Sequence, residues 1–220
     1  MRKVSVALFA LSLTLSVSTV YAQEGQPDAD PNGTRLLFGP TGRALPKGQV
    51  YLGVYEFFLP FVQIGVTDRI SIGGGTPLTF GFDEGHRPFW ITPKVQIVST
   101  ASTSVAVGAI HGLFGGKDGV GIGYVVGTHG TARGSFTAGA GVGYATDGAR
   151  TPIVMIGGEH QVRHNLKLIS ENYLGKGANG IAMEGVRFFG GSLSADLALG
   201  FPIGVGEFVA FPVVNFVYRF

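Results

Sequence analysis

The chain has 220 residues, of which 37 are Gly and none is Cys, and only 14% are charged. The absence of Cys excludes a disulfide framework, a thiol nucleophile and a Cys-based metal site. Hydrophobic residues make up 45% of the chain, which is too many for a disordered protein, and the abundant Gly does not follow the G-x-y repeat of collagen.

Residues 1–22 have the pattern of a secretory signal peptide. Arg2 and Lys3 precede an apolar run, and Val20-Tyr21-Ala22 is a small-residue cleavage site. An uncleaved membrane anchor is the alternative, but several Ser and Thr interrupt the apolar run. Cleavage leaves 14 basic and 14 acidic residues, so the mature chain has no charge excess that would favour nucleic acid as a partner.

From residue 48 onward, apolar and small or polar residues alternate with period two, and turn residues interrupt the alternation. This pattern predicts twelve strands, at 49–58, 60–66, 70–77, 89–98, 103–113, 119–128, 134–145, 151–162, 166–174, 180–189, 192–201 and 208–220. A count of ten is the alternative, because the break near Leu59-Pro60 carries the weakest turn signal.

Two architectures contain many short alternating strands, namely a soluble β-sandwich and a transmembrane β-barrel. One predicted face is aliphatic or aromatic, and the other is mostly Gly, Ser and Thr. In segment 119–128 the bulky set is Val120, Ile122, Tyr124 and Val126, and the small set is Gly121, Gly123 and Gly127. A face this small and uncharged does not suit water, but it suits the interior of a narrow barrel with the bulky face in lipid. We therefore predict an all-β fold, a closed antiparallel transmembrane β-barrel of about 12 strands at residues 48–220.

The last predicted strand supports a bacterial outer-membrane location. Its alternating apolar residues end at the terminal residue of the chain, with Phe216, Tyr218 and Phe220 on one face. This resembles the C-terminal signal of Gram-negative outer-membrane barrels, which the barrel-assembly machinery reads during insertion. The expected partners are therefore that machinery and outer-membrane lipid, and the oligomeric state is left open.

A scattered polar set alternates with apolar neighbours and is expected to face the lumen, because charged side chains in lipid are costly. It comprises Lys94, Gln96, Glu159, Gln161, Lys167, Glu171, Glu184, Asp196, Asn215 and Arg219. Glu184 and Arg187 fall on opposite faces of one predicted strand, so at least one of them departs from this rule. The set predicts either a salt-bridge network that fills the barrel, which we favour slightly, or a narrow passive pore for small solutes.

Two segments, Thr34 to Arg43 and Gly65 to Gly75, resemble a family of uncharacterised bacterial outer-membrane barrel proteins. The resemblance covers roughly residues 34–78 and implies a fold and a location, with no established activity. Residues 23–47 are predicted to be a periplasmic leader, or a plug that folds back into the lumen. In the second case Arg35, Arg43 and Lys47 accompany the apolar run Leu36-Leu37-Phe38.

No catalytic, cofactor-binding or metal-binding constellation emerges, and we predict that the protein is not an enzyme. His160 and His164 are four residues apart, which on a strand separates them by ~13 Å, so they do not form a metal site. Two alternative functions stay open. One is a soluble secreted β-sandwich that binds a ligand, and the other is a membrane-embedded hydrolase that uses His111 with a nearby Ser.

Overall fold

The computed structural model describes residues 30–78, 88–114, 118–204 and 209–220. The predicted signal peptide and the first residues of the predicted leader, 23–29, lie outside the described residues. Within them, no helix has the length and hydropathy that a membrane-spanning helix needs.

The described chain is almost entirely β-structure, as the alternation in the sequence predicts. One short 3₁₀ helix, η1 (Lys176–Ala178), interrupts the strands. The strands are β1 (Val50–Tyr55), β2 (Leu59–Gly65), β3 (Ile70–Gly75), β4 (Phe89–Ile91), β5 (Lys94–Ser99), β6 (Thr103–Phe114), β7 (Asp118–Gly130), β8 (Gly134–Ala145), β9 (Arg150–Arg163), β10 (Leu166–Leu174), β11 (Gly180–Gly190), β12 (Leu193–Ile203) and β13 (Phe211–Arg219).

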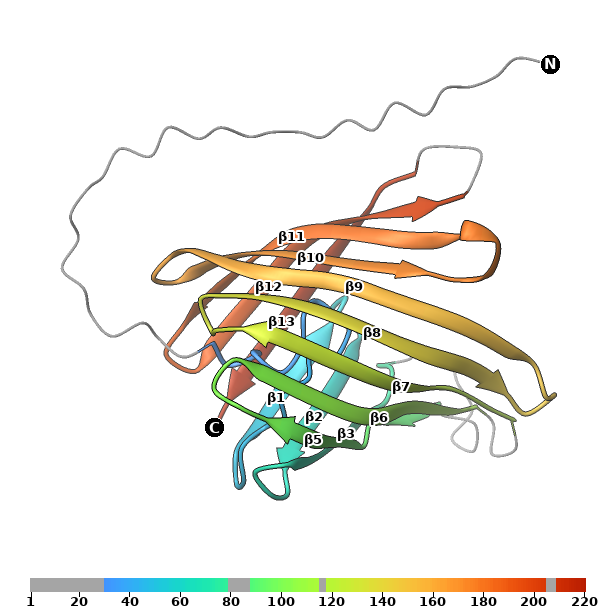
Figure 1. Ribbon diagram of the computed structural model, residues 1–220, viewed down its shortest axis with the longest axis horizontal. Coiled ribbons are helices and arrows are strands. Elements are labelled where there is room, and N and C mark those ends of the chain that lie inside the picture. The colour runs from blue at the N-terminus through green and yellow to red at the C-terminus, as the bar shows by residue number, and fades with distance from the viewer. Residues whose placement is uncertain (1–29, 79–87, 115–117, 205–208) are drawn as a thin grey trace, which may run out of the picture.

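The strands close into an antiparallel barrel (Figure 1). Apart from β4 and β5, which do not pair with each other, each strand pairs with its sequence neighbours. β1 pairs with both β2 and β13, which joins the two ends of the sheet. β4 and β5 both pair with β3 and with β6, so they share one position in the wall. The thirteen segments therefore form a twelve-strand barrel, which confirms the predicted fold and excludes the sandwich.

Segment 89–98, predicted as one strand, is divided at Thr92 and Pro93. Pro93 has no backbone N–H to donate to a ladder, which accounts for the interruption. A second irregularity follows between Gln96 and Val98, where the register to β6 shifts. The predicted boundaries of the other strands agree with the structure to within a few residues.

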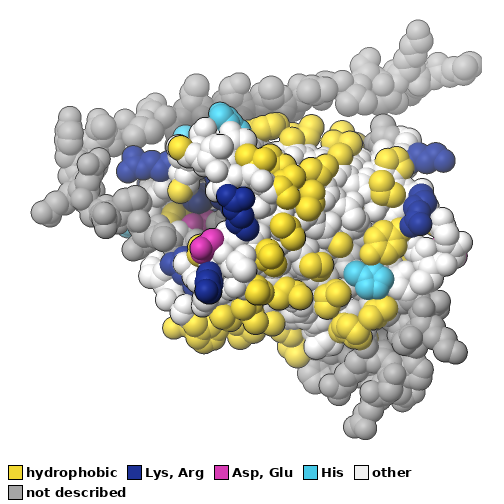
Figure 2. Space-filling view, turned by 60° about the horizontal axis from the view of Figure 1, so that its bottom comes forward, with side chains coloured by type: hydrophobic (Ala, Val, Ile, Leu, Met, Phe, Trp, Pro, Cys, Tyr) yellow, Lys and Arg dark blue, Asp and Glu magenta, His cyan; other side chains and the backbone are white. Residues whose placement is uncertain are grey.

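The outside of the barrel is apolar. Along β12, the side chains of Leu197 and Leu199 are each 49% exposed, whereas that of Asp196, the residue directly before Leu197, is 1% exposed. Figure 2 shows hydrophobic side chains spread across the visible wall, with Lys and Arg nearer its left and right edges. A bilayer accepts this surface because a closed barrel satisfies its backbone hydrogen bonds internally. The exterior is therefore a lipid-facing wall.

The faces of β7 are the reverse of the prediction. Val126 is 1% exposed and points inward, while Val125 is 45% exposed and points outward. The inward Tyr124 pairs with Gly108 of β6 and with Gly141 of β8. The bulky side chains of β7 thus occupy the space that inward glycines of the neighbouring strands leave empty, so the rule of bulky residues outside and small residues inside does not hold here.

Candidate functional site in the barrel lumen

The barrel has two ends, which are distinguished by the turns that lie at each of them. We call the end where β1 begins and β13 ends the terminal end. The turns after β2, β5, β7, β9 and β11 also lie there. The opposite end, at the turns after β1, β8 and β10, is called the far end.

The segment before β1 lies inside the lumen. Residues 33–41 form a small hairpin, in which the Leu36 N–H donates to Gly39 O at 2.9 Å and the Thr41 N–H donates to Thr34 O at 3.0 Å. We call it the lumen hairpin. Leu36 and Leu37 are 0% exposed and pack with Ile169, Met183 and Val213 of the wall. A plug role for residues 23–47 stays a proposal, which these contacts of the described part support.

Glu171 of β10 binds the tip of the lumen hairpin. Its carboxylate accepts the backbone N–H groups of Leu37 at 2.7 Å, Phe38 at 3.1 Å and Gly39 at 2.9 Å. The Tyr173 hydroxyl donates to the same carboxylate at 2.7 Å. Because ionised acceptors form stronger hydrogen bonds than neutral ones, this single side chain restrains three consecutive residues of the tip.

A continuous chain of ion pairs joins the base of the hairpin to the wall, with N–O distances of 2.6–3.1 Å. Its basic and acidic members alternate in the order Arg43, Glu159, Lys167, Asp30, Arg187, Asp196. We call this set the charge chain. Its wall members come from β9, β10, β11 and β12, so four neighbouring strands are tied to the segment inside them.

Arg187 is central to the charge chain. It is 0% exposed, bonds Asp196 through two nitrogens at 2.6 and 3.0 Å, and bonds Asp30 at 3.1 Å. It also donates to the carbonyls of Asn32 and Leu36. Burial disfavours the charge of Asp30, but the charges of Arg187 and Lys167 outweigh it and lower the Asp30 pKa from 3.8 to about 2.

Further wall side chains bond the backbone of the inserted segment. Asn215 donates to Leu37 O at 3.0 Å, and Lys94 donates to Thr34 O at 3.1 Å. Gln96 accepts the Ala44 N–H at 2.8 Å, and Thr128 accepts the Gly42 N–H at 2.9 Å. The wall therefore supplies hydrogen-bond partners along most of residues 30–44, and this part of the lumen is filled.

Most of the predicted lumen residues point inward and contact this segment or one another. Lys94, Gln96, Glu159, Lys167, Glu171, Asp196 and Asn215 are all buried. Gln161 and Arg219 are also on the inward side of their strands but are half-buried near the terminal end. Phe216, Tyr218 and Phe220 are exposed on the outside, at 39%, 48% and 75%.

Glu184 is the exception, and its assignment to the lumen is wrong. It lies on the outward face of β11, between the inward Met183 and Gly185, and its carboxylate accepts the Ser170 hydroxyl at 2.7 Å. Asn172 donates to the same Ser170 oxygen at 2.9 Å. These three side chains hydrogen-bond to one another on the outer wall, so the carboxylate is partly compensated without a position in the lumen.

Sequence reasoning missed Arg187, which takes the inward place on β11. The sequence shows only that Arg187 and Glu184 cannot both face the lumen on one regular strand. In the folded sheet, Arg187 is in register with the inward Lys167 and Asp196 of the adjacent strands. Because only the folded sheet sets this register, the sequence alone does not show which of the two residues faces the lumen.

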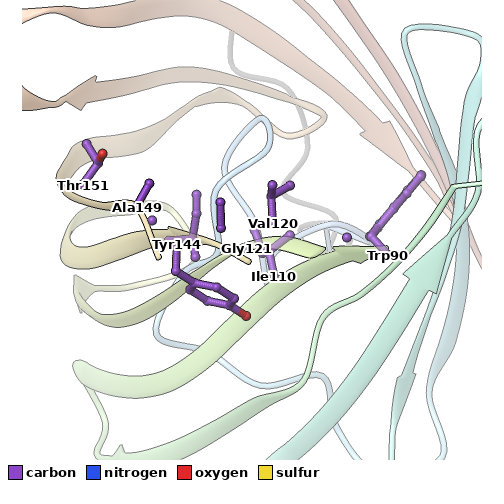
Figure 3. A pocket seen from close by; sticks show the side chains of 11 residues that line it. Trp90, Ile110, Val120, Gly121, Tyr144, Ala149 and Thr151 are labelled. Atoms are coloured by element: carbon purple, nitrogen blue, oxygen red, sulfur yellow. The ribbon is translucent and has the colours of Figure 1, made fainter. Parts of the chain in front are cut away.

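The far end of the lumen contains an apolar cavity of about 490 Å³, which we call the vestibule. Figure 3 shows Trp90 at one side, Ala149 and Thr151 at the other, and Ile110 and Val120 between them. Ile122 and Ala145 complete the inward lining. Among the residues that the structure describes, those that line the vestibule include no charged side chain.

The described residues contain no cluster of three or more His, Asp or Glu side chains that could hold a metal ion. His111, considered for a hydrolase, lies on the outer side of β6, and its Nδ1 is 3.0 Å from the Tyr144 hydroxyl. The two rings stack at 5.8 Å. The structure thus pairs His111 with a tyrosine.

Comparison with solved structures identifies the fold. A structure of the KdgM porin, and one of the KdgM porin in complex with disordered oligogalacturonate, each have a TM-score of 0.59 at 8% identity, covering 78% of this chain and 98% of the other. A loop L8 deletion mutant of OmpT, an outer membrane protein of Vibrio cholerae, has a TM-score of 0.43 at 11% identity, covering 74% of this chain and 62% of the other.

No protein-family model matches the chain, and no curated protein matches it in sequence. The likeness to the KdgM porin shows the fold, which is that of outer-membrane β-barrel proteins. The apolar exterior agrees with that location. The family suggested by residues 34–78 stays a prediction.

Proposed function

We propose that this protein is an outer-membrane barrel whose pore is closed by its own lumen hairpin, and that it passes small solutes when the hairpin leaves the lumen. The observation that carries the proposal is the nature of the contacts to residues 30–44. They are mostly hydrogen bonds and ion pairs, which water can replace.

The wall of the lumen is suited to a pore once the hairpin has gone. A twelve-strand barrel lies between the eight strands that side chains fill and the sixteen that leave an aqueous channel. The inward side chains that would line it include both Lys94, Lys167 and Arg187 and the acidic Glu159, Glu171 and Asp196. Because basic and acidic side chains are equally represented in this set, we expect the pore to discriminate only weakly between anions and cations.

Oligogalacturonate, the ligand named for the KdgM porin structure, is not the solute that we propose here. Each of its sugar units has a carboxylate, and the described residues that line the vestibule include no basic side chain. We further propose that the terminal end faces the periplasm, with residues 216–220 read by the barrel-assembly machinery.

The test is single-channel conductance in planar bilayers. The full chain should stay mostly closed. A chain without residues 33–41, and the point variant Glu171→Gln in the full chain, should open. Migration on an unheated detergent gel checks that each barrel is folded. Background conductance from both folded variants would overturn the pore and leave a purely structural barrel.

A hairpin that moves can also be followed directly, because the chain has no Cys. A single Cys at position 37, introduced as Leu37→Cys, should resist a small maleimide in the closed protein, since Leu37 is 0% exposed. Its labelling rate should rise together with the conductance. Conductance that rises without any change in labelling would show that solutes pass beside a hairpin that stays in place.

A further inference from the structure

We propose that the vestibule is a binding site for a small uncharged, mostly hydrocarbon molecule, such as a substituted benzene. This inference does not depend on the movement of the hairpin, because the described residues form this cavity while the hairpin is in the lumen. It goes beyond the proposed pore, because it names a ligand that is held in the lumen and not a solute that passes through it.

The lining has the chemistry of such a site. Its inward side chains are an aromatic ring and aliphatic groups, and its polar side chain on the inward face is the hydroxyl of Thr151. Val120 is 46% exposed although it points into the lumen. Covering apolar surface of this kind is favourable by about 25 cal/mol per Å², and the described lining residues offer no counter-charge to a charged solute.

Glycines create the space. Ile110 of β6, Ile122 of β7 and Gly143 of β8 are in register across three strands, and Gly112, Val120 and Ala145 form the next inward row. The two inward glycines leave a hollow between aliphatic side chains. The resulting volume of about 490 Å³ lies within the roughly 300–1,000 Å³ of small-molecule pockets.

Trp90 connects the vestibule to the interior. Its ring lines the vestibule and also packs against the buried cluster that contains Tyr55 and Phe61, against which the hairpin residue Phe38 packs as well. A ligand in the vestibule would therefore lie within reach of the only tryptophan of the chain, whose fluorescence can report its arrival.

The experiment uses the full chain in lipid nanodiscs and bromobenzene, a neutral ligand whose bromine quenches tryptophan. Saturable quenching of Trp90 is expected. Gly143→Leu fills the hollow and should weaken binding roughly tenfold or more, because an added Cβ meets only ordinary contacts at 3.5 Å and the rest of the side chain takes the place of the ligand.

Gly123→Leu is the matched control. Gly123 faces outward on β7, and an added Cβ there meets nothing within 4 Å, so its quenching curve should match that of the unchanged protein. Quenching that does not saturate, or that is identical in both variants, would mean that bromobenzene acts from the lipid, and would overturn the site.

A charged probe tests the class of ligand. 4-Bromobenzoate should bind roughly tenfold more weakly than bromobenzene, because the described lining residues include no cation and an ionised carboxylate loses its hydration on entry. Equal or tighter binding of 4-bromobenzoate, still sensitive to Gly143→Leu, would show that the site selects anions and that the proposed ligand class is wrong.

Discussion

The two halves of the lumen differ in how far they are filled and in the polarity of the side chains that line them. At the terminal end the interior is filled, and nearly every buried charge has a partner in the charge chain or in the hairpin backbone. At the far end the described residues leave a cavity with an apolar lining. Buried charges are stable only when they are paired and hydrogen-bonded, so these pairs restrain the filled half, whereas the cavity at the far end leaves room for the ligand that we propose.

The largest expected effect comes from breaking the charge chain at its centre. Arg187→Met leaves Asp196 and Asp30 buried without their main partner, which should cost about 3–5 kcal/mol of stability. Urea unfolding in lipid vesicles measures the loss. Adding Asp196→Asn to the same chain should recover part of it, and a single variant as stable as the unchanged barrel would contradict the assigned role.

A smaller effect is expected at the hairpin tip. Glu171→Gln keeps the shape of the side chain but removes the charge that accepts three N–H groups, which should weaken the hold on the tip by about 2 kcal/mol. Maleimide labelling of the Leu37→Cys variant should accelerate accordingly. Glu184→Gln, on the outer wall, is the matched control and should leave the labelling rate unchanged.

The link between Asp30 and its cations is open to a pH experiment. Because the folded pKa of about 2 lies below the ordinary 3.8, the ionised Asp30 stabilises the folded chain by about 2 kcal/mol. This contribution is fully present above pH 4 and is lost as the pH falls toward 2. The unfolding free energies of the unchanged protein and Asp30→Asn should therefore converge over that interval. A constant difference would show that ionisation of Asp30 contributes nothing.

The smallest expected effect comes from replacing a carboxylate on the outer wall, and it is compared with the same replacement in the lumen. Glu184→Leu replaces an outward carboxylate among lipid-facing leucines and should stabilise the barrel by about 1 kcal/mol. Glu159→Leu, the same change at a buried position that bonds Lys167 and Arg43, should destabilise it. Equal shifts of the same sign in urea unfolding would mean that the two faces have been assigned incorrectly.

The candidate site was only partly accessible from the sequence. Lys167 and Glu171 were found because charges that alternate with apolar residues on a strand are expected to avoid lipid. Their contacts could not be predicted, since Glu171 binds backbone N–H groups of a segment more than a hundred residues away, and backbone groups leave no trace in a residue pattern. The vestibule was missed for a related reason, because inward glycines and isoleucines on three strands form a cavity only when they are in register.

Period-two alternation and the turn residues between strands determined the all-β fold, the strand positions and the apolar outer face of β12 and β13, because each of these depends on neighbours along the chain. The tertiary structure decided the rest. It set the inward face of β7, where Tyr124 fills the space beside Gly108 and Gly141, and the exchange of Glu184 for Arg187 in the lumen. It also placed residues 30–44 inside the barrel. These outcomes depend on which residues meet across strands, and only the closed sheet sets that register.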